Sequence, residues 1–237
     1  MAIRRAHSKP PKQFGKRLRR REFRLALTED NISMIGDDLI RVAGLPRPEL
    51  RTLARELRAS GEWLEVVDGI EDSVVQFDPL RLRPDEAVRH LLSSKPLAEI
   101  GSDALLPEVC LEVEFGGENG PDFRAVCDEL KLTEPELIAA ICGAELRVDI
   151  VGFTPGFAYI SGLPEVLTVP RLKEPRKRVP AGSFGIAAGK CGTYALEGPG
   201  GWPLIGRVVN RLFNPEREQP FLLSAGQKVR VVRRGDV

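Results

Sequence analysis

The sequence has little of what acid–base and metal chemistry most often uses. Its 237 residues include two histidines, two methionines and two tyrosines. His7 lies in a basic amino-terminal segment, and His90 lies in a helical pattern next to Leu91. A zinc site or a Ser-His-Asp triad in the body of the chain would therefore depend on His90 alone. We interpret His90 as a residue at the rim of a helix face, which nearly excludes histidine chemistry.

Cysteine pairs and long apolar runs are also lacking. The four cysteines, Cys110, Cys127, Cys142 and Cys191, are far apart and form no CxxC motif. Because no secretory signal precedes them, we expect reduced thiols and a cytoplasmic location. No apolar run approaches the length of about 18 residues that a membrane-spanning helix needs, so we expect no membrane association.

Acidic residues are lacking from the start of the chain. Residues 1–21 contain nine lysines and arginines and no acid, which leaves 26 basic against 34 acidic residues in the rest. We interpret residues 1–27 as a basic disordered tail, since they lack a periodic apolar face. Two alternatives stay open: an organellar transit peptide, if the protein is eukaryotic, and a nucleic-acid-binding segment. The absence of interleaved aromatic residues argues against the second alternative.

The next part of the chain predicts a small α/β domain over residues 28–95. Short strands flank Gly36, and apolar residues at helical spacing predict a helix over 46–60 that Gly61 ends. Two strands separated by Asp68-Gly69 and a second helix, "PDEAVRHLLSS", follow. This order predicts a ferredoxin-like arrangement. Residues 96–107 are interpreted as a linker.

Residues 108–237 predict a β-rich second domain with two short helices near its start. Val109, Leu111, Val113 and Phe115 alternate with polar residues, and Glu112 and Glu114 are interpreted as solvent-facing. From Gly152 to Gly206 the chain contains eleven glycines and seven prolines, yet apolar residues persist. Short strands with tight corners, as in a β-barrel, fit this composition.

Three segments of this domain are candidate sites. In "GFTPGFAYISGL", Pro155-Gly156 fits the centre of a type II turn, and Phe153 and Phe157 either plug the end of a barrel or line a cleft. In "PRLKEPRKRVPAG", prolines hold Arg171 and Arg176, which could bind a carboxylate or a phosphate, although an exposed basic loop explains them equally. "EGPGGWPLIGR" offers glycines for close backbone approach to a ligand.

Together these segments and "LFNP" resemble the carboxyltransferase subdomain C/D family, also called allophanate hydrolase subunit 1. "GDDL", "EVVDGIEDSVVQFDPLRL" and "GGENGPDF" extend the resemblance from about Gly36 to Val232. The family includes the B-type subunit of ATP-dependent 5-oxoprolinase, an inhibitor of a sporulation histidine kinase, and part of urea carboxylase. The resemblance implies an α+β fold, a small α/β domain followed by a cyclophilin-like β-barrel.

The resemblance also implies a function. We expect a hydrolase subunit that converts 5-oxoproline to glutamate with ATP bound through the complex. Expected partners are a paired carboxyltransferase-like subunit of related barrel fold and a third, lactam-utilising subunit, without membrane or nucleic acid. The alternatives are a non-catalytic regulator that inhibits a histidine kinase and the carboxyltransferase or allophanate hydrolase component of urea degradation. Biotin is not expected on this chain, because no biotin-attachment motif is present.

The positions that match the family's motifs are expected to form a cleft for substrate or partner. They are Phe153, Pro155, Gly156, Phe157, Arg171, Arg176, Pro180, Ala181, Gly182, Ser183, Gly200, Gly201, Trp202 and Arg207. No metal ligand and no catalytic residue is assigned. The chain departs from the family's pattern at Ile141, where a histidine is usual, and at Lys190 and Cys191.

Overall fold

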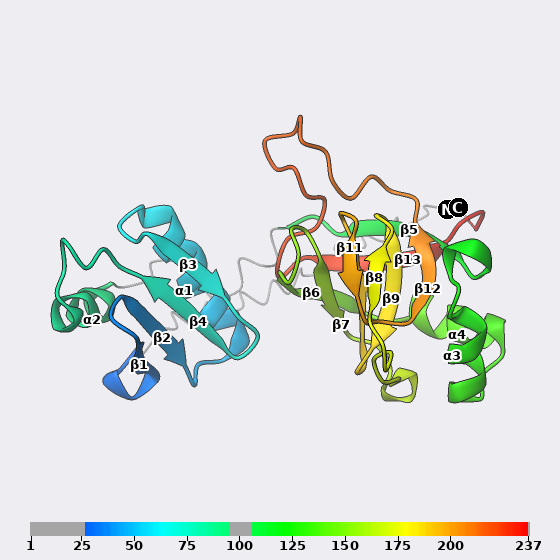
Figure 1. Ribbon diagram of the computed structural model, residues 1–237, viewed down its shortest axis with the longest axis horizontal. Coiled ribbons are helices and arrows are strands. Elements are labelled where there is room, and N and C mark those ends of the chain that lie inside the picture. Colours follow the sequence, from blue (N-terminus) through cyan, green and yellow to red (C-terminus); the bar gives the residue numbers. More distant parts are fainter. Residues whose placement is uncertain (1–26, 95–105, 237) are drawn as a thin grey trace, which may run out of the picture.

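The computed structural model describes residues 27–94 and 106–236. The predicted basic tail, apart from Leu27, lies outside the described residues, and so does the predicted linker apart from residues 106–107. In Figure 1 the described parts form a small helix-and-sheet unit and a larger barrel unit.

The small unit is a four-stranded antiparallel sheet with two helices. A short 3-10 helix, η1, leads into it, and the sheet order is β1-β2-β4-β3. In chain order the elements are η1 (Glu29–Asn31), β1 (Ile32–Ile35), β2 (Leu39–Ala43), α1 (Arg47–Ser60), β3 (Glu65–Asp68), β4 (Asp72–Gln76) and α2 (Pro84–Ser93). A ferredoxin-like β-α-β-β-α-β order places its last strand after the second helix. Here the corresponding edge strand comes first, as β1.

Alternation and helical spacing decide which side of this sheet is covered. Ile40 and Val42 of β2 are fully buried and share one face with Val75 of β4, while Arg41 between them is exposed. The apolar face of α1, including Leu53, packs in the same core cluster. Gly61 ends α1 in the left-handed conformation, with φ of 68°. The predicted strand and helix order of this part is confirmed.

The larger unit is a closed seven-stranded barrel with the order β10-β7-β6-β13-β5-β12-β9. Its strands are β5 (Val109–Phe115), β6 (Leu146–Val151), β7 (Ala158–Ser161), β9 (Ser183–Ala187), β10 (Lys190–Thr193), β12 (Leu204–Val208) and β13 (Lys228–Arg233). Its other elements are η3 (Gly117–Asn119), α3 (Phe123–Leu130), α4 (Glu134–Cys142), η4 (Glu165–Leu167) and the separate strand pair β8 (Arg176–Val179) and β11 (Gly198–Gly200). The α+β fold class is confirmed.

Closure of the barrel brings its first and last strands together. β13 pairs with β5 in parallel, with Val231 opposite Leu111. Both side chains are buried in the barrel core. The connection between β12 and β13 is long and projects from the barrel in Figure 1, where it is drawn in orange. Phe213 and Phe221 form a β-bridge across this connection, with ring centroids 5.0 Å apart.

The two inserted helices follow from local sequence signals. The Thr133 hydroxyl accepts a hydrogen bond from the Glu136 amide at 3.4 Å, and the Glu136 carboxylate accepts one from the Thr133 amide at 2.8 Å. This is the capping box that the sequence predicts at the start of α4. Val126 of α3 and Leu137 of α4 pack in the barrel core.

Candidate functional site

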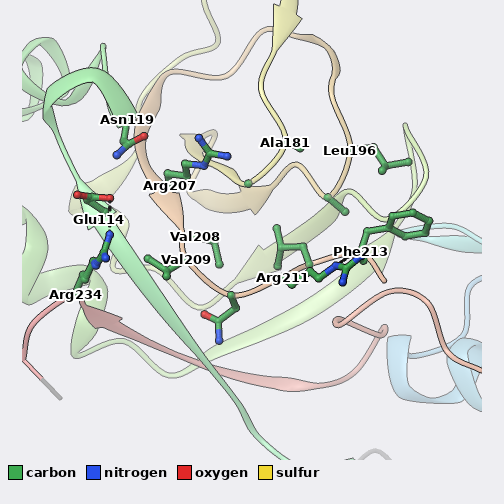
Figure 2. A pocket seen from close by; sticks show the side chains of 14 residues that line it. Glu114, Asn119, Ala181, Leu196, Arg207, Val208, Val209, Arg211, Phe213 and Arg234 are labelled. Carbon is green, nitrogen blue, oxygen red and sulfur yellow. Dashed lines mark hydrogen bonds and ion pairs between the residues drawn. The ribbon is translucent and has the colours of Figure 1, made fainter. Parts of the chain in front are cut away.

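A pocket of about 650 Å³ opens beside β12. Its wall comes from five segments that are distant in the sequence: the end of β5, η3, two turns that flank β9 and β10, the start of the β12–β13 connection, and the end of β13. The lining residues are Glu114, Asn119, Ala181, Gly182, Ala195, Leu196, Arg207, Val208, Val209, Asn210, Arg211, Leu212, Phe213 and Arg234. Figure 2 shows Arg207, Asn119, Glu114 and Arg234 toward one side and Arg211 and Phe213 toward the other.

Arg207 is the predicted arginine that the structure places in this pocket. It lies on β12 and is exposed, and its guanidinium forms no hydrogen bond or ion pair with the residues that the structure describes. Gly182 packs against its stem: a Cβ on Gly182 would lie 3.2 Å from Arg207 Nε. Gly182 also has φ of 86°, a conformation that favours glycine. The turn therefore leaves room for the arginine.

The other polar residues of the pocket are tied to the fold to different degrees. Arg234 pairs with Glu114 at 3.2 Å. Arg211 donates through Nε to the Phe213 carbonyl at 3.1 Å, so its terminal nitrogens stay available. Asn210 accepts from the Glu112 amide at 2.8 Å and donates to the Cys110 carbonyl at 3.2 Å. Asn210 thus fixes the start of the β12–β13 connection against β5.

The segment from Phe153 to Phe157 forms the predicted type II turn. The Phe157 amide donates to the Thr154 carbonyl at 3.0 Å, and Gly156 has φ of 74°. A Cβ on Gly156 would lie 2.2 Å from a Phe221 ring carbon, so the close packing also requires glycine. Phe153 takes φ of 74° as well, which is strained for a residue with a side chain.

The aromatic side chains of this corner divide between core and surface. Phe157 is 1% exposed and stacks edge-on against Tyr194 at 4.7 Å and Trp202 at 5.5 Å. Phe153 is 65% exposed. Phe157 and Trp202 therefore plug the barrel, as one of the two interpretations predicts, whereas Phe153 faces outward and neither phenylalanine lines the pocket.

The structure brings the proline-spaced segment and the glycine-rich turn together. β8 pairs with β11, with Arg176 opposite Gly200, and the Leu172 amide donates to the Gly201 carbonyl at 2.7 Å. Arg171 is exposed. Outside the pocket lining lie Pro155, Gly156, Arg171, Arg176, Pro180, Ser183, Gly200 and Gly201, so of the predicted cleft only Ala181, Gly182 and Arg207 line it.

Arg176 has a carboxylate partner within its own chain. Its Nη2 donates to Asp122 Oδ1 at 2.8 Å, and Asp122 Oδ2 accepts from the Leu204 amide at 2.6 Å. The side chains of Arg176 and Asp122 are 30% and 18% exposed. Asp122 therefore joins β8 and β12 to the start of α3.

We expect Asp122→Ala to lower the free energy of unfolding by about 2–3 kcal/mol, because two donors lose a charged acceptor in a partly buried place. Chemical denaturation measures this change. Glu197→Ala is the matched control, since it removes an acid from the more exposed Arg178–Glu197 pair, whose side chains are 77% and 48% exposed. Equal effects from both variants would refute a stabilising role for Asp122.

The positions that depart from the family's pattern lie outside the pocket lining. Ile141 is fully buried in the barrel core, and Lys190 pairs with Asp149 at 2.6 Å. Cys191 is fully buried, and burial raises its thiol pKa from 9.0 to about 12. The remaining histidine of the body, His90, lies 3.3 Å from Glu62 and stacks on Trp63 in the small unit.

The raised pKa of Cys191 predicts a pH dependence. A thiol that ionises more easily unfolded than folded stabilises the fold below pH 9 and loses this contribution as pH rises toward 12. At pH 8 we expect a thiol reagent to label the native chain at the partly exposed Cys110 before Cys191. Mass spectrometry after timed labelling measures the order, and early modification of Cys191 would contradict its burial.

Sequence reasoning missed most of the polar pocket. Glu114 was predicted only as part of a solvent-facing strand side, and Asn119, Arg211 and Arg234 were not singled out. Arg211 comes four residues after Arg207 and immediately precedes "LFNP", so its nearness to the family's motifs was the available signal. Among the described residues, no three histidine, cysteine, aspartate or glutamate side chains lie close enough to hold a metal ion. No helix in the same part of the chain is long and apolar enough to cross a membrane.

Comparison with known proteins gives relatives of one name, the B-type subunit of 5-oxoprolinase. The relative of this name from Escherichia coli O157:H7 is 44% identical over 134 residues, which are 55% of this chain and 62% of the relative. The relative from Haemophilus influenzae is 34% identical over 218 residues, covering 86% of this chain and 98% of the relative. This chain thus spans less than two thirds of the first relative and nearly all of the second.

A solved structure and a family model agree with this result. The crystal structure of TTHA0988 superposes with a TM-score of 0.72 at 29% identity, over 82% of this chain and 39% of that one. Residues 36–223 match the model of the carboxyltransferase domain, subdomain C and D. The predicted resemblance is confirmed, and the chain belongs to the carboxyltransferase domain family of subdomains C and D.

Proposed function

We propose that this chain is the B-type subunit of an ATP-dependent 5-oxoprolinase, which converts 5-oxoproline to glutamate. The observation that carries the proposal is the 34% identity to the Haemophilus influenzae relative of that name over 98% of the relative's length. The pocket around Arg207 supports it, because a cationic, partly apolar hollow suits a small organic anion.

The chain works in this proposal as part of a complex. Its pocket offers arginines and amides, which bind and orient anions and stabilise developing negative charge. Neither His90 nor Cys191 lines the pocket, and the buried Cys191 thiol stays protonated at neutral pH. A paired carboxyltransferase-like subunit and a lactam-utilising subunit would supply the groups that activate water. ATP is used through the complex.

Reconstitution tests this function. The full chain is mixed with both partner subunits, and glutamate formed from 5-oxoproline is measured with and without ATP. We expect ATP-dependent glutamate formation from the complete mixture and none when this chain is left out. Full activity from this chain alone, or an inactive complete complex, would refute the proposal.

A further inference from the structure

The pocket around Arg207 carries more positive charge than a single carboxylate ligand would balance. Its lining contains three arginines, Arg207, Arg211 and Arg234, and one acid, Glu114. Two positive charges therefore remain after Glu114 is counted. A carboxylate brings one negative charge, whereas a phosphoryl group brings about 1.5 to 2 at neutral pH. The charge of the pocket thus matches a phosphoryl group better.

The donors of the pocket have the form that phosphoryl oxygens require. The guanidinium of Arg207 has no partner among the described residues, and Arg211 uses only its Nε. A guanidinium presents parallel N–H donors that bind two oxygens of one phosphoryl group. The Asn119 amide also lines the pocket and forms no hydrogen bond with the described residues, so it offers a further donor.

The fold keeps Arg207 in place for this role. Gly182 lies against its stem, with a would-be Cβ 3.2 Å from Nε, and the Val208 amide donates to the Gly182 carbonyl at 2.8 Å. The Glu114–Arg234 pair, at 3.2 Å, lines the pocket as well. Because Arg234 already has a carboxylate, it adds to the positive field, while Arg207 and Arg211 make the direct contacts.

The size of the pocket indicates an organic phosphate. About 650 Å³ is within the range of small-molecule sites and well above what a free phosphate ion fills. Val208, Val209 and Leu212 give the pocket an apolar part between its two cationic sides (Figure 2). A ligand with a phosphoryl group and a less polar body would use both parts.

We propose that this pocket is a binding site for the phosphoryl group of an organic phosphate. Two sources share this chemistry: a nucleoside phosphate, and an acyl-phosphate form of the substrate. The link to catalysis rests on the proposed function, in which ATP drives the opening of a lactam. The binding itself is a property of this chain and is measured without turnover.

Calorimetric titration of the full chain tests the site at constant ionic strength. The probes are inorganic phosphate, ADP, acetyl phosphate, acetate and 5-oxoproline. We expect at least one of the two organic phosphates to bind more than tenfold tighter than either carboxylate. Tighter binding of ADP identifies the nucleotide as the source, and tighter binding of acetyl phosphate identifies the acyl phosphate.

Variants locate the binding. Arg207→Gln is expected to weaken the preferred phosphate about tenfold to a hundredfold, since a charged hydrogen bond is lost. Arg124→Gln, an exposed arginine of α3 outside the pocket lining, is the matched control and should change binding less than about twofold. Circular dichroism of both variants checks that the fold is retained, and Arg211→Gln provides a second pocket variant.

Several outcomes would overturn the site: no binding of any phosphate, equal or tighter binding of acetate or 5-oxoproline, or equal losses in Arg207→Gln and Arg124→Gln. Failure of the proposed function is distinguishable. An inactive reconstituted complex with Arg207-dependent phosphate binding refutes the 5-oxoprolinase assignment and keeps the site. An active complex whose chain binds no phosphate refutes the site and keeps the assignment.

Discussion

Phe157→Ala is expected to lower the free energy of unfolding by about 3–5 kcal/mol, the range for removing a buried phenylalanine from a well-packed core. Phe157 is 1% exposed, and its ring contacts the rings of Tyr159, Tyr194 and Trp202 at centroid distances of 4.7 to 5.5 Å. The closed barrel cannot collapse easily around the space left behind. Urea denaturation followed by tryptophan fluorescence measures the loss.

Phe153→Ala is the matched control, because the same side chain is removed four residues earlier in the same turn. Phe153 is 65% exposed and contacts Phe157 edge-on at a centroid distance of 5.8 Å. We expect a loss of no more than about 1 kcal/mol, the contribution of one aromatic pair. Similar losses in the two variants would show that Phe157 does not anchor the barrel core.

Arg207→Gln is expected to lower kcat/KM of the reconstituted complex by about a hundredfold. The substitution removes the positive charge and the paired donors that we assign to the anionic ligand, and such a contact contributes about 1.5–3 kcal/mol. The melting temperature should stay nearly unchanged, because Arg207 is exposed and has no partner among the described residues. A large fall in melting temperature would instead assign Arg207 a structural role.

Local patterns predicted most of the fold. Alternation over 109–115, the capping residues Thr133 and Glu136, and the Pro155-Gly156 turn each depend on neighbouring residues, so the sequence displays them directly. The structure agrees at each place. The edge position of β1 was not apparent, because strand order depends on pairing between segments that the pattern leaves unspecified.

The candidate site was harder to predict because barrel closure assembles it. Glu114 and Arg234 are 120 residues apart in sequence, and the parallel pairing of β13 with β5 brings them to one pocket. The partner of Arg176, Asp122, is 54 residues away and lies in no motif that resembles a binding site. Sequence reasoning identified Arg207 and Gly182 through a family motif, whereas the charges around them come from the fold.

The most direct test of the account is kcat/KM of the reconstituted complex carrying Arg207→Lys, measured beside the complex carrying Arg124→Lys. Lysine keeps the charge and loses the planar pair of donors. If the Arg207 pocket is this chain's part of the active site, Arg207→Lys should lower kcat/KM about tenfold or more at an unchanged melting temperature, and Arg124→Lys should leave it unchanged. Equal kcat/KM values in the two complexes would contradict the account.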